Sequence, residues 1–419
     1  MPTWLRLLLT RQMLICVFTG FSSGLPLYLL LNLLPAWLRS EGVDLKTIGF
    51  FALIQFPYTW KFLWAPLLDR YHLPLGRRRG WMLVSQIGLL LAIGWLGGFS
   101  PAGNLQPVIW LSVVLAFLSA TQDVALDAFR REILNEQELG LGNSVHVNAY
   151  RIAGLVPGSL SLILADLLPW AQVFWITAAF MLPGMAMVLL VSEPAAPGAP
   201  KTLRQAVVEP FQEFIGRKGW LGALLVLAFI FLYKLGDSLA TALSTPFYLD
   251  LGYSKTDIGV IAKHAGLWPA VIGGLLGGLW MVRLGINRAL WLFGFVQMFT
   301  ILGFAWLAWR GVQPVIDGFD RAALASVIAA EYLGVGLGTA AFTAFIARAT
   351  NPAFTATQFA LFTSLAAVPR TFINASAGAL VEAMGWVSFF ILCFALAAPG
   401  MLLLFKVAPW NEAAPSPKA

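Results

Sequence analysis

Long apolar segments follow one another along the whole chain and decide what it can fold into. Only 11% of the residues are charged and 59% are hydrophobic, whereas a soluble domain carries roughly 25% charged residues. A segment of this kind must satisfy its backbone polar groups internally, so it crosses a bilayer as a helix. Charged residues and Pro/Gly breaks delimit twelve such segments, at 12–38, 46–68, 82–100, 107–129, 143–167, 170–191, 220–248, 256–282, 289–309, 322–347, 355–380 and 386–407. The sequence therefore predicts an all-α membrane protein with twelve transmembrane helices.

Several function classes are disfavoured by what the chain lacks. The net charge is +7, but the basic residues lie in short loops between spans, so we expect no nucleic-acid partner. Cys16 and Cys393 fall inside apolar segments and indicate neither a disulfide nor a metal site. There is no phosphate-binding loop and no H-E-x-x-H motif, and the three His are scattered. We expect no metal, no cofactor and no enzymatic activity. The first apolar segment is too long for a cleaved signal peptide and reads as a true span.

The basic residues are distributed asymmetrically between the two sides of the membrane. Seventeen Lys and Arg residues lie on the side of both termini and the even-numbered loops, five lie on the other side, and the remaining five of 27 lie within spans. Cytoplasmic loops carry such an excess. Both termini are therefore predicted to be cytoplasmic.

The chain divides at its midpoint. The longest loop, 192–219, contains the linker-like EPAAPGAP and then TLRQAVVEPFQEFIG, which predicts a short amphipathic surface helix interrupted at Pro210. This gives an N-terminal half (1–191), a cytoplasmic linker (192–219), a C-terminal half (220–407) and a cytoplasmic tail (408–419). Gly42 and Ile48-Gly49 recur as Gly252 and Ile258-Gly259, at a constant offset of 210. Two parallel six-span halves are the architecture of the major facilitator superfamily, in which substrates bind near the midplane.

A charged loop between the second and third spans fits that architecture. LLDRYHLPLGRRRGW (67–81) resembles the signature loop of the superfamily. An acid at a helix end beside a basic cluster can latch neighbouring helices in one state of a gate. The alternative is a basic anchor of the membrane topology, but an anchor does not need the acid. We assign a gating role to Asp69, Arg70, Arg77 and Arg78. The second-half counterpart, LWMVRLGINRA (279–289), lacks the Asp.

Nine Lys, Arg, Asp and Glu residues lie at membrane depth within the predicted spans, away from the span ends. Each costs at least about 2.5–3.5 kcal/mol at membrane depth, so each is a functional candidate. None lies on the third, sixth, ninth or twelfth span, the four that usually sit outside the cavity in this superfamily. This placement indicates a polar pathway between the halves. The residues are Lys61, Asp123, Asp127, Arg151, Lys234, Asp237, Lys263, Glu331 and Arg370.

The acids are candidates for proton coupling, because a buried carboxylate binds and releases a proton as its surroundings change. Asp123 and Asp127 stand four residues apart in SATQDVALDAFR (119–130), on one helix face. Asp123, which is deeper and lies beside Gln122, is the better proton carrier. Asp127 is also close enough to Arg130 and Arg131 to be a structural partner at the helix end. Glu331 is the second candidate.

The cations and nearby polar residues are candidates for substrate binding. Lys61, in PYTWKFLWAP (57–66), is predicted to contact a substrate anion, although a Lys near a helix end can also snorkel. Arg151 and Arg370 suit contact with a substrate carboxylate, because a guanidinium can bind both carboxylate oxygens. Either can instead pair with an acid of the fourth span or with Glu331. Lys234 and Asp237 can pair with each other on one helix face. The assigned substrate-binding residues are Tyr58, Trp60, Lys61, Gln122, Arg151, Lys234, Asp237, Lys263 and Arg370.

Glycines in the eighth predicted span indicate close helix packing. The stretch GGLLGGLW (273–280) spaces them three and four residues apart, which lets a neighbouring backbone approach.

Several long motifs together resemble the AmpG family of muropeptide permeases. They are GFSSGLPLYLL (20–30), DLKTIGFFALIQFPYTWKFLWAPLLDRY (44–71), GRRRGW (76–81), TQDVALDAFR (121–130), LYKLGDSLA (232–240) and ATQFALFTSLAAVPR (356–370). The resemblance runs from about residue 12 to 407. It implies a proton-driven importer in a Gram-negative inner membrane, with Asp123 as the natural coupling acid.

The cargo implied by the resemblance is GlcNAc-1,6-anhydro-MurNAc with or without a stem peptide, released by cell-wall turnover and recycled. For such cargo, Tyr58 and Trp60 are candidates to stack on sugar faces, and the alternative for each is packing against lipid or the core. In some bacteria such cargo also carries the signal for β-lactamase induction. Better-known relatives are longer, with further hydrophobic segments. The alternatives are a carrier of another bulky anion, such as an acetyl-coenzyme A-like compound, and a muropeptide receptor that does not transport. A monomer is the default for this superfamily.

Overall fold

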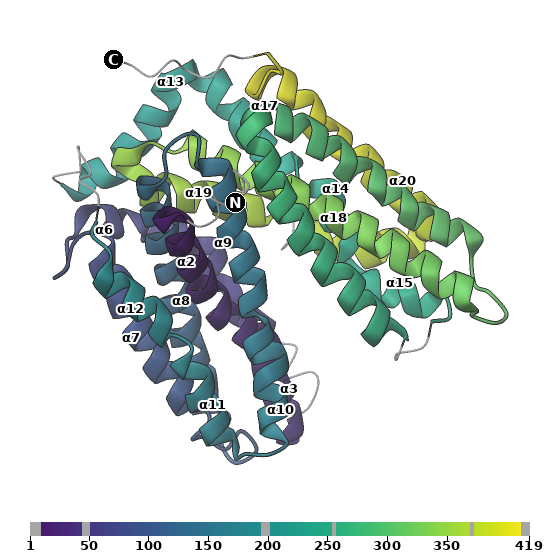
Figure 1. Ribbon diagram of the computed structural model, residues 1–419, viewed down its shortest axis with the longest axis horizontal. Coiled ribbons are helices and arrows are strands. Elements are labelled where there is room, and N and C mark those ends of the chain that lie inside the picture. Colours follow the sequence, from purple (N-terminus) through teal and green to yellow (C-terminus); the bar gives the residue numbers. More distant parts are fainter. Residues whose placement is uncertain (1–9, 44–50, 194–201, 254–256, 369–372, 412–419) are drawn as a thin grey trace. The chain divides into compact units, whose positions relative to one another are not determined.

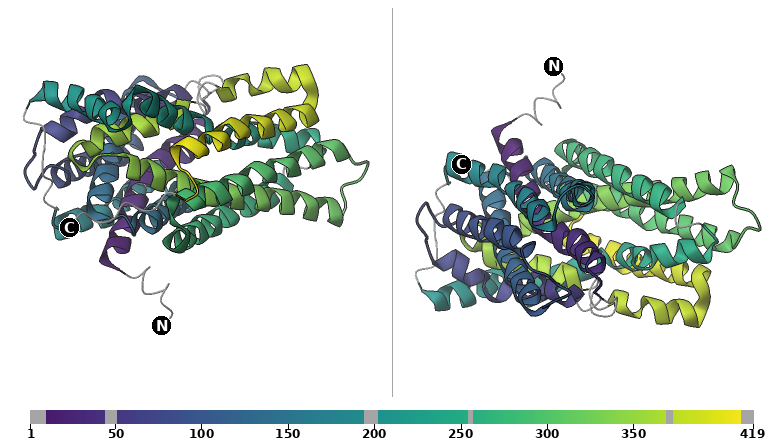
Figure 2. Two further views of the ribbon diagram at one scale, coloured as in Figure 1. Left: turned by 90° about the horizontal axis from the view of Figure 1, so that it is seen from above. Right: turned by 90° about the horizontal axis from the view of Figure 1, so that it is seen from below.

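The computed structural model describes residues 10–43, 51–193, 202–253, 257–368 and 373–411, and their regular structure is helical apart from one isolated bridge between Leu73 and Gly76. Contacts divide the chain into two compact units (Figures 1 and 2). Unit 1 comprises Met1–Asn135, Val145–Gln212 and Thr350–Ser364, and unit 2 comprises Glu136–Ser144, Glu213–Ala349 and Leu365–Ala419. Each unit therefore includes a short segment from the other predicted half.

Unit 1 is built mainly from the first half of the sequence. Its helix α7 packs side by side with α8, α11 and α12, and α2 packs against α8 and α12 (Figure 1). The elements are α2 (Arg11–Tyr28), a π-helical turn (Leu29–Leu33), α3 (Leu34–Ser40), α5 (Phe56–Trp60), α6 (Ala65–Arg70), α7 (Arg79–Leu96), α8 (Gln106–Ile133), most of α9 (Leu139–Ala153), α10 (Ser161–Ala165), α11 (Trp170–Ala179) and α12 (Leu182–Leu190).

Unit 2 is built mainly from the second half. Its long helix α17 packs against α18 and α20, and α14 packs against α20 (Figure 1). The elements are the later part of α13 (Leu203–Leu232), α14 (Leu235–Ala242), α15 (Ser244–Asp250), α17 (Lys263–Arg310), α18 (Gly318–Ala349) and α20 (Ala377–Val407). Helix α19 (Thr355–Val368) begins in unit 1. The interruption predicted at Pro210 was wrong, because α13 continues through Pro210 and changes direction at Gly219 instead.

Nine helical segments of the described chain are long and apolar enough to cross a membrane. One of them, Val260–Arg310, runs through two predicted spans, and Gly285 breaks it with a φ of 74°. Gly385 breaks α20 in the same way, with a φ of 76°. These left-handed conformations suit Gly because it has no side chain. The loops predicted at 283–288 and 381–385 are thus tight turns within nearly continuous helix.

The second and eleventh predicted spans are less regular than expected. The second, from residue 51 onward, is a series of short α- and 3₁₀-helical pieces. Pro57 and Pro66 each remove a backbone donor, which favours such breaks. The eleventh contains α19 and continues after residues 369–372, which lie outside the described part. Each of the twelve predicted segments is mainly helical where it is described.

The predicted repeat at an offset of 210 has matching backbone geometry. Gly42 and Gly252 have φ of 84° and 92°. Beside them, the Val43 N–H donates to the Leu38 carbonyl at 3.0 Å and the Tyr253 N–H to that of Tyr248 at 3.2 Å. This six-to-one bond with a left-handed Gly is a Schellman helix end. The same termination therefore follows the first predicted span of each half, after α3 and after α15.

Close helix contacts at glycines confirm the packing that the sequence predicts. A Cβ at Gly273 would lie 2.4 Å from the Leu333 carbonyl oxygen of α18. In unit 1, a Cβ at Gly20 would lie 2.1 Å from the carbonyl oxygen of His146, so α2 touches the backbone of α9. Such contacts replace hydrophobic burial as the force between helices in lipid.

We predict that Gly20→Ala destabilises the protein by about 1–3 kcal/mol, because the added methyl has to push two backbones apart. Gly378→Ala is the matched control, since a Cβ there meets no atom within 4 Å. The control should be neutral or slightly stabilising, as Ala is the better helix former. Melting temperatures in one detergent test the pair, and equal values would contradict the close contact.

Candidate functional site

Lys61 lies between two carboxylates of α8. It occupies the 3₁₀ turn Lys61–Leu63 between α5 and α6 and is 5% exposed. Its Nζ lies 3.2 Å from Oδ2 of Asp123 and 3.9 Å from Oδ2 of Asp127. The two acids share one helix face, as their four-residue spacing predicts. Lys61, which was predicted to bind a substrate anion, is thus neutralised by Asp123 and Asp127, which were predicted to couple protons.

Further contacts complete this cluster. Asp127 Oδ1 pairs with Arg130 at 2.8 Å, which confirms the predicted helix-end pair. The hydroxyl of Ser23 donates to Asp123, and the amide of Gln122 donates to the Ser22 carbonyl at 2.8 Å. Two cations thus face two acids. We call Lys61, Asp123, Asp127 and Arg130 the balanced cluster.

The predicted aromatic residues lie near it on the same short helices. The ring of Trp60, 36% exposed, stacks between Phe56 and Phe62, with centroids at 5.3 and 5.9 Å. Tyr58 packs against the hydrophobic core of unit 1. Trp60 thus has an aromatic neighbour on each side. A sugar-stacking role for either residue stays a prediction.

Unit 2 holds a second polar cluster. Lys234, at the junction of α13 and α14, places its Nζ 2.6 Å from Oδ2 of Asp237, which confirms the predicted pair. The same Nζ donates to Oε1 of Gln297 at 2.8 Å. A Cβ at Gly338 would lie 2.0 Å from that oxygen, so the glycine makes room for the amide. The sequence analysis missed Gln297.

Glu331 is the unbalanced member of this second cluster. It lies on α18 and is fully buried, and neither carboxylate oxygen has a hydrogen-bond partner among the described residues. The neighbouring Thr300 hydroxyl donates instead to the Gln297 carbonyl at 3.0 Å. Among the side chains that the structure describes, Lys234 and Asp237 are the charged groups close enough to act on Glu331. Two acids therefore share one cation.

Three further residues are predicted to bind substrate. Arg151 is half-buried on α9. Lys263 begins α17, but its side chain lies outside what the structure describes. Arg370 lies outside the described residues altogether. Their substrate roles stay predictions.

The predicted latch residues Asp69 and Arg78 form a buried ion pair, with Arg78 Nη2 at 2.7 Å from Asp69 Oδ1. Asp69 also accepts hydrogen bonds from the start of α19, from the Ala356 N–H at 3.3 Å and from the N–H and hydroxyl of Thr357 at 2.9 and 2.7 Å. A carboxylate is favourable at a helix N-terminus because unpaired N–H groups point toward it. Asp69 thus ties two segments that lie far apart in the sequence.

Glu132, the C-terminal acid of α8, extends this network. Its Oε1 accepts from Arg78 Nη2 at 2.8 Å and from Arg77 Nη2 at 3.0 Å. Burial lowers the pKa of Arg78, but Glu132 and Asp69 outweigh it and raise the pKa above the usual value. Glu193 accepts from the backbone N–H of Arg78 at 3.0 Å. We call Asp69, Arg77, Arg78, Glu132 and Thr357 the latch.

Arg70, the fourth predicted gating residue, has a different contact. Its guanidinium lies over the ring of Tyr71, 5.5 Å from the centroid. The sequence analysis missed Glu132, Glu193 and Thr357. Two of these acids have positions that could have indicated a role. Glu132 directly follows Arg130-Arg131, and Glu193 lies just after the sixth predicted span. Nothing local marks Thr357, which reaches the latch from across the sequence.

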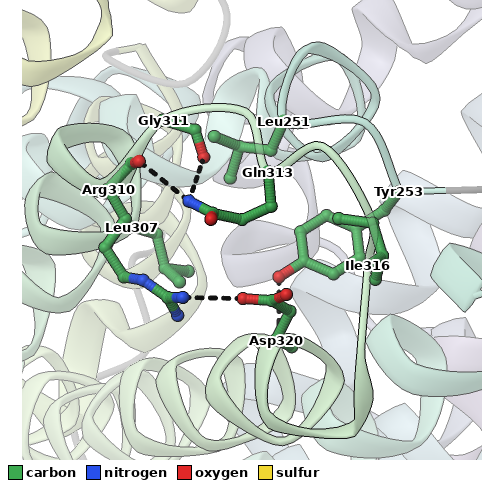
Figure 3. A pocket seen from close by; sticks show the side chains of 8 residues that line it. All are labelled: Leu251, Tyr253, Leu307, Arg310, Gly311, Gln313, Ile316 and Asp320. Carbon is green, nitrogen blue, oxygen red and sulfur yellow. Dashed lines mark hydrogen bonds and ion pairs between the residues drawn. The ribbon is translucent and has the colours of Figure 1, made fainter.

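A polar corner of unit 2 is self-contained (Figure 3). Arg310 pairs with Asp320 at 2.7 Å, Tyr253 donates to the Asp320 carbonyl at 2.8 Å, and Gln313 donates to the Arg310 carbonyl at 3.0 Å. These groups satisfy one another, so we interpret the corner as structural. Among the described residues, no three His, Cys, Asp or Glu side chains are grouped to hold a metal ion.

We predict that Glu132→Gln destabilises the protein by about 3–5 kcal/mol, because removing one partner of a buried pair leaves charge uncompensated. Glu382→Gln is the control, since Glu382 is exposed on α20. Thermal unfolding in detergent measures both. The latch would be wrong if the two variants melted alike.

The chain is similar to several known proteins. A model of the Major Facilitator Superfamily matches residues 16–373. An "Uncharacterized protein" of Haemophilus influenzae is 52% identical, with 96% of each chain covered. "Anhydromuropeptide permease" of Escherichia coli (strain K12) is 42% identical over 96% of this chain and 80% of its own length. The crystal structure of the human organic anion transporter MFSD10 (TETRAN) superposes with a TM-score of 0.70 at 16% identity, covering 96% of this chain and all of that one.

These likenesses confirm the predicted fold class and the prediction that the chain is a multi-pass membrane transporter rather than an enzyme.

Proposed function

Because this chain belongs to the major facilitator superfamily and, within it, to the AmpG family, we propose that it imports anhydromuropeptides by proton symport. The cargo is GlcNAc-1,6-anhydro-MurNAc with or without its stem peptide, taken from periplasm to cytoplasm for recycling. The observation that carries the proposal is the 42% identity to anhydromuropeptide permease over 96% of this chain. Bacterial relatives and the basic-residue asymmetry support an inner-membrane location with both termini cytoplasmic.

The balanced cluster suggests how an anion and a proton are coupled. A muropeptide carries carboxylates, and Lys61 is the cation already shared by Asp123 and Asp127. A substrate carboxylate that approaches Lys61 competes with Asp123 for it. The displaced Asp123 is then a half-buried carboxylate without its counter-ion, which favours proton uptake. Substrate binding and protonation of Asp123 thus support each other.

Glu331 is the second acid in the proposal. A fully buried carboxylate without hydrogen bonds is costly, and the protonated form avoids most of that cost. We therefore propose that Glu331 holds a proton in the conformation described here. Its release requires a rearrangement that brings Lys234 closer or admits water.

The latch supplies the gate of an alternating-access cycle. Asp69 binds the start of α19, so these bonds must break before that segment can move away from α6. Asp69, Arg77 and Arg78 are accordingly proposed as gating residues. Arg70, held on Tyr71, has no contact that supports this role.

We predict that Asp123→Asn abolishes accumulation of labelled anhydromuropeptide in cells lacking their own permease but preserves counterflow exchange. One proton that enters with one substrate carboxylate carries no net charge, so the pH gradient drives accumulation, by about tenfold per pH unit. A protonophore should abolish this accumulation by wild type and should leave uptake by the variant unchanged.

Glu382→Gln is the control, because Glu382 is exposed and distant in sequence from Asp123. Cells with this variant should accumulate substrate normally. A change next to Asp123 is less suitable, because Gln122→Glu would add charge. Full accumulation by Asp123→Asn would exclude Asp123 as the coupling acid. A correctly inserted wild type that moves no muropeptide would refute the cargo, and bulky phosphorylated anions would be tested next.

For Glu331 we predict a protonated carboxyl at neutral pH. Infrared difference spectra between wild type and Glu331→Gln should show the C=O stretch of a carboxylic acid that only wild type has. Glu331→Gln should also fold normally, since an amide imitates the neutral acid. Absence of that band would show that Glu331 is ionised and has a counter-ion.

A further inference from the structure

The first part of α13, residues 203–218, forms a separate surface helix that we call the linker helix. A capping box fixes its start: the Gln205 N–H donates to the Thr202 hydroxyl at 3.2 Å, and the Thr202 N–H donates to Gln205 Oε1 at 3.1 Å. Gly219, with a φ of 71°, ends it. The apolar segment Gly219–Ala242, long enough to span a membrane, follows directly.

One side of the linker helix is attached to the protein. Ala206 and Pro210 are buried there. The Gln358 amide donates to the Pro210 carbonyl at 2.9 Å, and Arg217 Nη1 donates to the Ala349 carbonyl at 2.7 Å. Both contacts are made with one stretch of chain, 349–358, which ends beside the latch residue Thr357.

The opposite side is apolar and exposed. Val207, Val208 and Phe211 are 44%, 38% and 42% exposed. Phe211 stands four and three residues after the two valines, so the three side chains are neighbours on one helix face. Polar residues, Glu209 and Gln212, border this face. The linker helix is therefore amphipathic with its apolar side outward, the form of helices that lie in a membrane interface.

The bilayer is the occupant that the chain itself places there. The linker helix ends one residue before a membrane-spanning segment whose first turns expose Trp220, Leu221 and Leu224, by 70%, 73% and 57%. The apolar face thus starts at the lipid surface. The sequence has a basic residue near each end of the linker helix, Arg204 and Lys218. Basic residues at both ends of an interfacial helix favour anionic headgroups.

We propose that the apolar face of the linker helix lies in the headgroup region of the adjacent leaflet and binds anionic phospholipid. Through Gln358 and Arg217 the bound helix holds segment 349–358 at the bilayer surface. Because the latch bonds of Asp69 are made at the end of that segment, anionic lipid stabilises the latched conformation. This inference does not depend on the identity of the cargo.

Matched cysteines on neighbouring positions test the proposal. Phe211→Cys and Gln212→Cys are made in a background with Cys16→Ala and Cys393→Ala, labelled with an environment-sensitive fluorophore, and placed in nanodiscs of phosphatidylcholine with or without phosphatidylglycerol. We expect the label at 211 to shift to the blue and to be quenched by spin-labelled lipid, more strongly with phosphatidylglycerol. The label at 212 should be quenched by aqueous iodide.

Equal quenching of both labels by iodide would overturn the proposal, as would shielding at 211 that depends on protein concentration, which indicates a second copy of the chain. A second measurement guards against poor folding of the cysteine variants. Val207→Ser with Phe211→Ser should lose the rise in melting temperature that phosphatidylglycerol gives wild type, while Gln212→Ser keeps it. Neither readout requires transport, so a failed uptake assay leaves this test intact.

Discussion

The pairing of Lys61 with Asp123 and Asp127 is the interaction on which the proposed coupling depends. Charge inside a bilayer is tolerated only when it is paired or neutralised by a proton. In unit 1 that requirement is met, because two cations face two acids. Any anion that binds Lys61 upsets the balance, and a proton on Asp123 restores it. The same requirement makes Glu331 a place for a second proton, since one cation there serves two acids.

The rest of the structure keeps these charges in position and lets them move together. Close glycine contacts, such as Gly20 of α2 against α9 and Gly273 of α17 against α18, hold helices together without hydrophobic force. The latch fastens the start of α19 to Asp69 by hydrogen bonds and ion pairs, which break and re-form more readily than a packed core. A transporter needs both kinds of contact, one rigid within a bundle and one reversible at a helix end.

Much of the fold could be read from the sequence, because apolar length and glycine spacing are local. The repeat at Gly42 and Gly252, the Asp127–Arg130 pair and the Lys234–Asp237 pair were all predictable from spacing alone. Contacts across long sequence distances were not. Nothing in the sequence joins Thr357 to Asp69 or gives Lys61 both of its acids, and Gln297 is an unremarkable amide until Lys234 reaches it. Broken helices at Gly285 and around Pro57 also blurred the predicted boundaries.

Counting the protons that accompany substrate binding tests the central claim most directly. Calorimetric titration of the purified protein with an anhydromuropeptide, in buffers of different ionisation enthalpy, gives that number. The account predicts proton uptake by wild type near neutral pH, and less uptake by Asp123→Asn with binding retained. Identical proton uptake by the two proteins would contradict the exchange of Asp123 for a substrate anion at Lys61.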